Sequence, residues 1–510
     1  MGSPVFGRDG EAGSADRPVF DVLRWASNRS SSLAAAALVP LAVYLPLVIR
    51  RYGWSDDFPF LLIPGLEEVM VANGRPLLAL IHRIAFPSQD IDSLALTRLV
   101  GVIGISAFAV LTAVLLRRWG LSPWFSALLG GSIVLLPAFQ TFAGWAMTFT
   151  YSWVACVGLL AGELWVISRR PVCRILAVVG MAAGLVVYPP AAFVCWSMLA
   201  VRTALLRTPV RAAFGQAIDL AILTVGSSLL AFATAASVAH WQGVEFAQRV
   251  GLITSPAEAF SKGVWFVTHP LIVAFRPFMI SSPSGLEALC TGGVLLLATT
   301  IGLALRAPGS AADRLLWSAL VLVMLCGAFL AHLVTRGNQI DFRFLVGLSI
   351  GGWLLTVIGI RELLGRLVPG LRRFPDQLSS RLGPVVAIVA LLLLAGLART
   401  AYRNVGEVFV WPSRTTEAEI SRQLATFDAA VHRRVLIVNH SSWWPHKSNL
   451  GIFSTRSDLS HGWVEKPLVL LLLSEAGHET SGLVVEVSTS AMTADASTHI
   501  VDLRVLRNQL

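Results

Sequence analysis

Two adjacent carboxylates, Asp56 and Asp57, stand in the stretch Trp54–Phe58, directly after the first long apolar run of the chain. Acidic side chains at the edge of such a run are costly unless they are solvated, bound to a cation or used on a substrate. A carboxylate can remove the proton of a hydroxyl as that hydroxyl attacks. Neighbouring side chains point different ways, so we expect one carboxylate to be the base and the other to bind a metal ion or a substrate hydroxyl. Which one does which stays open, and a solvated pair or a helix cap is the alternative.

Arginines in other loops can supply the positive charge that binds phosphate. Arg75, in the sequence Asn-Gly-Arg-Pro, either binds phosphate or forms a salt bridge to the acidic pair. Arg336 and Arg343 follow the ninth apolar run, at an end where arginine opposes the charge bias of membrane proteins. We therefore expect them to bind phosphate, and contact with lipid headgroups or pairing with Asp341 is the alternative.

Two histidines complete the candidate set. His332 precedes Arg336 by one helical turn and can share its face, although a packed, neutral histidine fits equally. His269 lies in a long aromatic loop and can close over a substrate, with anchoring at the membrane surface as the alternative.

The elements that must position these residues are membrane helices. The chain has 510 residues, of which 55% are hydrophobic and 14% charged, and its mean hydropathy is +0.69. A soluble domain has about a quarter of its residues charged. The apolar residues come in blocks near the ~20 residues that cross a bilayer. The pattern predicts a polytopic α-helical membrane protein, and because the arginines sit in short gaps between blocks, nucleic acid is not expected as a partner.

The blocks predict about eleven spans, with the N-terminus in the cytoplasm and the C-terminus outside. This orientation places the gaps with the most arginine on the cytoplasmic side. A Pro189-Pro190 break separates the fifth span from the sixth, and if the two formed one bent helix every later loop would invert. The spans are expected at about 33–50, 94–116, 122–138, 144–168, 173–188, from Pro190 to Arg202, 215–238, 286–305, 314–334, 343–360 and 383–399.

Three parts flank or interrupt the spans. Residues 1–32 are polar and predict a cytoplasmic tail. The outer loops 51–93 and 239–285 alternate apolar and basic residues, which suits helices lying in the membrane surface. Residues 400–510 are less apolar. A helical pattern at 414–430 and strand-like runs near 435–438, 483–487 and 500–503 predict a small α/β domain on the outer side.

With an acidic pair after the first span and the Asn-Gly-Arg-Pro element behind it, the chain resembles the GT-C superfamily of integral-membrane glycosyltransferases. The bacterial O-antigen glucosyltransferase type is the nearest likeness. The resemblance covers the spans to about residue 400 in outline. It implies a sugar carried on polyprenyl phosphate and inverting transfer to a cell-envelope glycan or glycolipid. The site would lie at the outer face of the bacterial cytoplasmic membrane. A divalent cation, Mg²⁺ or Mn²⁺, is compatible with the acidic pair, but the sequence names no further ligand.

Two other classes stay open. An outer-face polysaccharide polymerase or ligase also uses many spans and outer arginines, on a lipid-pyrophosphate substrate, but does not need the acidic pair. A transporter or flippase of lipid-linked sugar is expected to have paired repeats and helices broken near the middle of the membrane.

Overall fold

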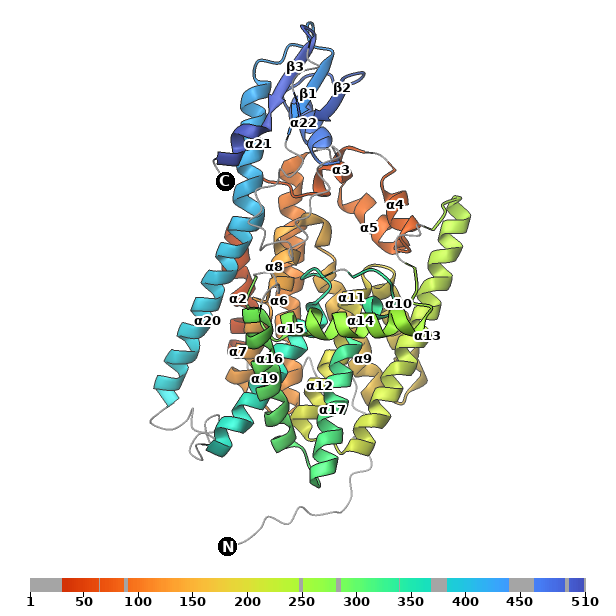
Figure 1. The fold of residues 1–510 in the computed structure, drawn as a ribbon, viewed down its shortest axis with the longest axis vertical. Coiled ribbons are helices and arrows are strands. Elements are labelled where there is room, and N and C mark those ends of the chain that lie inside the picture. Colours follow the sequence, from red (N-terminus) through yellow and green to blue (C-terminus); the bar gives the residue numbers. More distant parts are fainter. Residues whose placement is uncertain are drawn as a thin grey trace.

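The computed structural model describes residues 30–63, 65–86, 90–246, 251–280, 286–338, 340–367, 383–439, 463–490 and 495–508. The expected tail at 1–32 lies outside these ranges, apart from its last three residues, which already belong to helix α2. The described part is a helix bundle with a small sheet at one end (Figure 1). We call this end of the bundle the sheet end.

Within the described ranges, eight helices are long and apolar enough to cross a membrane, or nine if the bent pair α7 and α8 counts as one span. The protein is therefore a multi-pass membrane protein by its helices. The remaining two expected spans correspond to α10 and α17, of 15 and 17 residues. The bundle helices are α2 (Ser30–Val48), α6 (Leu94–Arg118), α7 (Pro123–Ile133), α8 (Pro137–Gly144), α9 (Tyr151–Ile167), α10 (Pro171–Leu185), α11 (Pro189–Ala192), α12 (Val194–Leu206), α13 (Val210–Gln242), α16 (Leu286–Arg306), α17 (Ala311–Gly327), α19 (Val346–Leu367) and α20 (Gly383–Val405).

Prolines interrupt the helices of the bundle at two places. Pro137 begins α8 after a bend of 62° from α7, because proline cannot continue the hydrogen-bonding of the preceding turn. The Pro189-Pro190 break separates α10 from α12, with the short α11 between them. Glu163, near the end of α9, lies 3.8 Å from Arg202, near the end of α12. Because α10 starts just after α9 ends, α10 and α12 run in opposite directions, and each of them packs against α9.

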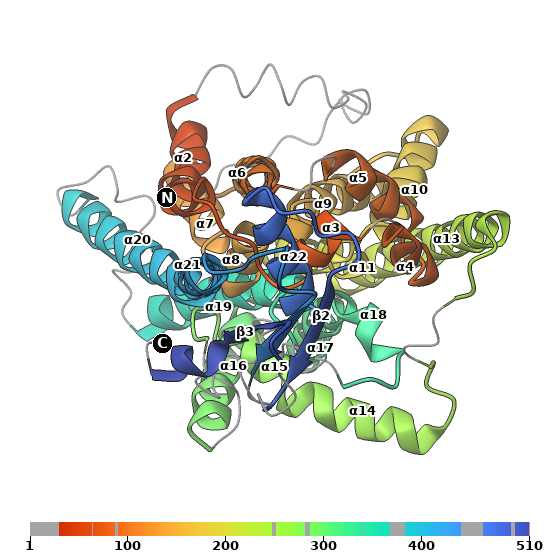
Figure 2. The same ribbon diagram turned by 90° about the horizontal axis from the view of Figure 1, so that it is seen from above.

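The arginine-bearing connections gather away from the sheet. The ends of α12, α16 and α19 and the starts of α13, α17 and α20 all lie at the end opposite to the strands (Figure 1). The first long loop lies at the sheet end and forms α3 (Asp57–Leu62), α4 (Glu67–Ala72), α5 (Pro76–Ala85) and η1 (Ile91–Ser93). The loop after α13 forms α14 (Pro256–Thr268) and α15 (Pro270–Ala274), and α18 (Leu330–Leu333) precedes α19. Seen from the sheet end, α3 lies over the middle of the bundle, and α13, α14 and α20 lie at its edge (Figure 2).

The C-terminal part is an α/β unit joined to α20 by a continuous helical rod. The π-helix η5 (Gly406–Val410) connects α20 to α21 (Trp411–Leu424). The strands β1 (Arg434–Val438), β2 (Val484–Ser488) and β3 (Thr498–Asp502) are all parallel in the order β2-β1-β3. In this register Val435 pairs with Val485 on one side and His499 on the other. Helix α22 (Glu465–Glu475) precedes β2, and η8 (Leu503–Asn508) follows β3.

This unit shares its apolar core with the first loop. Phe58 and Leu61 of α3 are buried in one cluster with Ile420 of α21, Ile437 of β1 and Leu468 of α22. Burying a large aliphatic or aromatic side chain contributes about 1.5–3 kcal/mol. The sheet unit is therefore packed onto the loop that carries the acidic pair.

Candidate active site

A closed turn presents the acidic pair. Asp57 N–H donates to the Trp54 carbonyl at 3.0 Å, and Trp54 N–H donates back to Asp57 Oδ2 at 2.9 Å. Between them, Ser55 adopts φ 46°, a left-handed conformation that is uncommon outside glycine. Gly53 is required before the turn, since a Cβ there would stand 2.5 Å from the Phe58 ring. The turn holds both carboxylates at the start of α3.

Asp57 is a fully buried carboxylate whose two oxygens are both used. Oδ2 accepts from Trp54 N–H and Oδ1 from Met147 N–H at 3.0 Å. Burial raises the pKa of Asp57 from 3.8 to about 7, against the opposing effects of the Arg98 guanidinium and the two amides. This geometry joins the turn to η2 (Ala146–Thr148), and the complete burial of the side chain keeps a substrate from reaching it.

Asp56 is the accessible member of the pair. Its side chain is half-buried and makes no cap on α3, so the helix-cap interpretation does not apply to it. Oδ1 accepts a hydrogen bond of 2.9 Å from the indole of Trp463, just before α22. A half-exposed carboxylate held at one oxygen can use the other on a substrate.

Arg98, on the first turn of α6, fixes the chain that leads into the turn. Its side chain is fully buried and donates to the carbonyls of Val48, Tyr52 and Arg50 at 3.1, 2.7 and 2.8 Å. Its guanidinium also lies 3.7 Å from the centre of the Tyr52 ring. Arg98 thereby satisfies carbonyls at the end of α2 that have no intrahelical partner.

The C-terminal unit holds the same segment from the other side. Arg51 pairs with Glu475, the last residue of α22, and lies 3.1 Å from Asp92. Gly53 N–H donates to Glu417 of α21 at 2.9 Å. The acidic turn is thus fixed by the bundle below and by the sheet unit above.

Arg343 is a cation that interacts electrostatically with Asp56 of the acidic turn. Its Nε lies 2.9 Å from Asp341 Oδ2, and its guanidinium lies 4.8 Å from the centre of the Trp145 ring. Burial works to lower the pKa of Arg343, but Asp341 and then Tyr188 raise it, with a smaller contribution from Asp56, and the net effect is a raised pKa. Arg343 therefore stays charged within electrostatic range of Asp56.

Tyr188 interacts electrostatically with both Arg343 and Arg75. The Arg75 guanidinium is 5.5 Å from the centre of the Tyr188 ring, and the other neighbour of that ring is Tyr151, stacked at 3.5 Å. Tyr188 is 1% exposed, and its hydroxyl has no hydrogen-bond partner among the described residues. Burial raises the pKa of Tyr188 far above its ordinary value. Among the described residues the Tyr188 hydroxyl is therefore a donor without an acceptor, within electrostatic range of two arginines.

His332 lies within electrostatic range of Lys262, Arg75 and Arg343. The imidazole of His332 packs between the rings of Phe329 and Phe344, at 5.0 and 4.4 Å. Burial, together with the charges of Lys262, Arg75 and Arg343, lowers the pKa of His332 to about 4. His332 is therefore neutral. Lys262 of α14 donates to the Gly337 carbonyl at 2.6 Å, close under the loop that carries Arg343.

Two expected site residues are engaged elsewhere. Arg336 lies 3.2 Å from Glu258 and donates to Thr254 at 2.7 Å, so it ties the loop before α19 to the start of α14. His269 is exposed at the junction of α14 and α15, where its Nδ1 lies 2.8 Å from the Thr268 hydroxyl. The described contacts do not link either residue to Asp56 or Arg343.

Within the described part of the chain, no three His, Cys, Asp or Glu side chains are placed to hold a metal ion. Both oxygens of Asp57 are also committed to backbone amides. The acidic pair therefore does not fit a Mg²⁺ or Mn²⁺ site as it stands.

Three residues of this site are not predicted from the sequence. Arg98 lies within an expected span, Tyr188 lies at the end of another, and Trp463 lies in the expected C-terminal domain. Neither a protein-family model nor a curated protein sequence matches the chain.

Proposed function

We propose that the protein is a membrane glycosyltransferase that moves a sugar from a polyprenyl-phosphate donor to a hydroxyl of an envelope glycan or glycolipid. One observation carries the proposal: the half-buried carboxylate of Asp56 lies within electrostatic range of the half-buried, positively charged Arg343. A base and an anion-binding group suit the two ends of a displacement at an anomeric carbon.

In the proposed reaction Asp56 accepts the proton of the acceptor hydroxyl. The hydroxyl oxygen forms a bond to the anomeric carbon as the bond from that carbon to the phosphate oxygen breaks. The lipid phosphate leaves with the bonding electrons, and Arg343 and Arg75 bind its growing negative charge. Attack opposite to the leaving group inverts the anomeric configuration. Asp57 holds the turn that aims Asp56 and does not touch the substrate.

The arrangement of arginines supports an outer-face location. The connections rich in arginine lie at the end opposite to the strands (Figure 1), and arginine-rich connections favour the cytoplasmic side. The acidic turn, Arg75 and Arg343 then lie on the outer side, where lipid-linked sugars are displayed for envelope assembly. The membrane concerned is proposed to be the bacterial cytoplasmic membrane.

The test measures transfer in membranes from a panel of polyprenyl-phosphate hexoses and pentoses to envelope glycan. Asp56→Asn is expected to lower the rate about 100-fold or more, the usual contribution of a general base. Glu68→Gln, in exposed α4 of the same loop, is the matched control and keeps full activity. Full activity of Asp56→Asn would exclude the proposal.

One observation favours a transporter as the second candidate. The 62° bend between α7 and α8 breaks a helix inside the bundle, as transporters do at their substrate sites. Purified protein in vesicles that moves lipid-linked sugar across the bilayer, at a rate unaffected by Asp56→Asn, would establish that function instead.

A further inference from the structure

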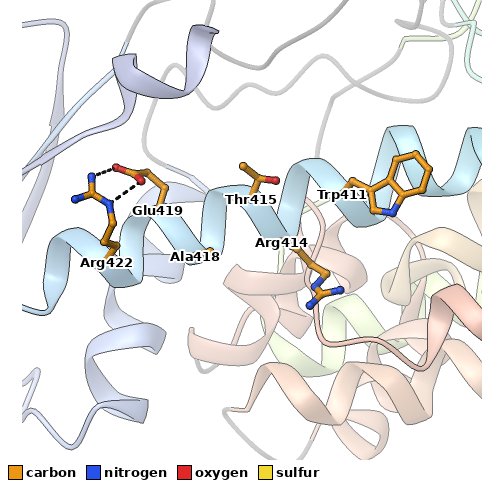
Figure 3. Close-up of a pocket in the computed structure, with 6 residues that line it drawn as sticks. All are labelled: Trp411, Arg414, Thr415, Ala418, Glu419 and Arg422. Carbon is orange, nitrogen blue, oxygen red and sulfur yellow. Dashed lines mark hydrogen bonds and ion pairs between the residues drawn. The ribbon is translucent and has the colours of Figure 1, made fainter. Parts of the chain in front are cut away.

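A groove runs along α21, the helix that rises from the last span to the sheet unit. Its volume is about 480 Å³. Figure 3 shows Trp411 at one end and the Glu419–Arg422 ion pair at the other. The lining residues are Trp411, Arg414, Thr415, Ala418, Glu419 and Arg422. Since α20 alone has 23 residues, about enough for a ~30 Å hydrocarbon core, the charged α21 lies beyond the membrane.

A second cleft, of about 660 Å³, shares Arg414 and Ala418 with this groove. It continues between α21 and the end of α22 and reaches Arg51, Glu417 and Glu475. Its apolar lining includes leucines from both helices. The two clefts therefore adjoin each other at Arg414 and Ala418, and we call them together the trough.

Trp411 provides a flat aromatic surface in this trough. The indole packs over Gly406 of the π-helix, where a Cβ would stand 2.7 Å from Trp411 Cζ2. The side chain nevertheless stays 38% exposed. One part of the ring is thus supported by backbone, and the rest is open to a ligand. Tryptophan combines apolar area with few rotatable bonds, which suits stacking on the apolar face of a sugar ring.

The charges of the trough are balanced. Arg422 forms two hydrogen bonds with Glu419, and Arg51 pairs with Glu475. Arg414 makes no hydrogen bond or ion pair with the described residues, so its donors are available. The carboxylates at the far end would repel an anionic ligand, and the arginines would repel a cationic one. Hydroxyl groups can donate to the former and accept from the latter.

We propose that this trough binds a neutral, hydroxyl-rich glycan chain: a remote part of the acceptor, stacked on Trp411 and hydrogen-bonded by Arg414. That this glycan is the acceptor rests on the proposed transfer reaction. Binding of a glycan by the trough does not depend on that reaction.

The trough is separate from the reaction point. Asp56 contacts Trp463, just before α22, and Arg51 contacts Glu475 at its end. An 11-residue helix is about 16 Å long. A chain in the trough must therefore extend along α22 to bring a hydroxyl to Asp56, so the trough is expected to favour long acceptors. Binding energy from a remote part of a substrate can be used in this way.

The test measures binding to full-length protein in nanodiscs. The probe is polysaccharide extracted from the envelope of the native host, either intact or cut by mild acid to its smallest repeats. Intact chain is expected to bind the wild type. Trp411→Ala and Arg414→Ala are each expected to weaken binding about tenfold, the effect of about 1.4 kcal/mol.

Matched controls separate the trough from surface effects. Trp124→Ala and Arg314→Ala remove an exposed tryptophan and an exposed arginine from α7 and α17 and should leave binding unchanged. Loss of Trp411 can loosen η5, so Arg414→Ala must show the effect with an unchanged unfolding temperature. No binding by the wild type, or equal binding by wild type and Arg414→Ala, overturns the inference. So does Trp411-dependent binding to phosphatidylglycerol vesicles without binding to polysaccharide, which would make the trough a headgroup site.

Asp56→Asn distinguishes this inference from the proposed function. A variant that binds intact polysaccharide but does not transfer sugar supports both. Binding with undiminished transfer removes the proposed function and leaves a glycan site. Transfer that depends on Asp56, without polysaccharide binding, removes the trough alone.

Discussion

The indole N–H of Trp463 donates a hydrogen bond to Oδ1 of Asp56, 2.9 Å away, although 407 residues separate them along the chain. Trp463 directly precedes α22, and that helix packs on α3, which begins right after Asp56. The C-terminal unit thus contacts the proposed base itself. Trp463 is a positioning residue on this interpretation, because it orients a carboxylate and does not touch the reacting atoms.

Replacing Trp463 with phenylalanine keeps an aromatic ring and removes the donor. The transfer rate is expected to fall about threefold to tenfold, since a hydrogen bond to a charged group contributes about 1.5–3 kcal/mol when buried and less when exposed. The acidic limb of the pH–rate profile should also move to higher pH, because the hydrogen bond that the variant lacks stabilises the charged carboxylate. Trp241→Phe, at an 83% exposed position on α13, is the control. An unchanged pH profile would rule out the positioning role.

Arg98→Met is expected to destabilise the protein by several kcal/mol. It leaves three buried carbonyls, those of Val48, Arg50 and Tyr52, without their donors, at about 1–3 kcal/mol each. Arg98→Lys should fall between wild type and Arg98→Met, because an ammonium cannot reach all three acceptors in the planar geometry of a guanidinium. Thermal unfolding in detergent measures the order. Arg83→Met, exposed on α5, should have no effect, and a tolerated Arg98→Met would show that the clamp is dispensable.

Much of the helix bundle follows from the blocks of apolar residues, because length and hydropathy are local properties. The strands near 435, 484 and 500 also stand where short apolar runs predict them. Neither property measures contacts between distant segments. The count of eleven spans and the outer position of the sheet unit therefore stay predictions.

The site was less accessible to sequence reasoning for the same reason. Adjacent carboxylates look equivalent in a sequence. Burial against Met147, 90 residues away, makes Asp57 structural and leaves Asp56 accessible. Arg336 and Arg343 are seven positions apart, yet Glu258 holds the first and Asp341 the second. Arg98 could have been singled out from its position alone, because an arginine near the start of a membrane span is costly unless it has a role.

Glu465 of α22 gives the sheet unit a pH-dependent stability. Its side chain is 2% exposed, and Oε1 accepts from Asn439 at 2.8 Å. Burial raises the pKa of Glu465 from 4.5 to about 7. The folded state therefore holds a proton that the unfolded state releases above pH 4.5. The contribution of this group to stability falls as pH rises from about 4.5 to about 7.

Glu465→Gln keeps the acceptor for Asn439 and removes the titration. We expect the unfolding temperature of the wild type to fall more steeply between pH 5 and 8 than that of the variant, with the variant the more stable at pH 8. Glu479→Gln, exposed in the same unit, is the control. Parallel pH profiles for wild type and Glu465→Gln would contradict the assignment.

Tyr188 and Tyr44 form a contrasting pair of buried tyrosines. Each is at most 1% exposed. The Tyr44 hydroxyl donates to the Val134 carbonyl at 2.8 Å, whereas that of Tyr188 has no partner among the described residues. A buried hydroxyl without a partner is costly in the free protein. The unpaired hydroxyl of Tyr188 is explained if it donates a hydrogen bond to an oxygen of a ligand. A phosphate bound by Arg75 and Arg343 would supply such an oxygen.

Tyr188→Phe should therefore leave the unfolding temperature unchanged or raised, and lower sugar transfer about tenfold through one lost hydrogen bond to a charged oxygen. Tyr44→Phe should do the reverse. It loses a satisfied bond and about 1 kcal/mol of stability, and each folded molecule keeps its activity. Both quantities are measured on the same purified samples. If Tyr188→Phe were fully active, the hydroxyl would not contact the donor phosphate, and the phosphate would have to bind away from the Arg75 side of the ring.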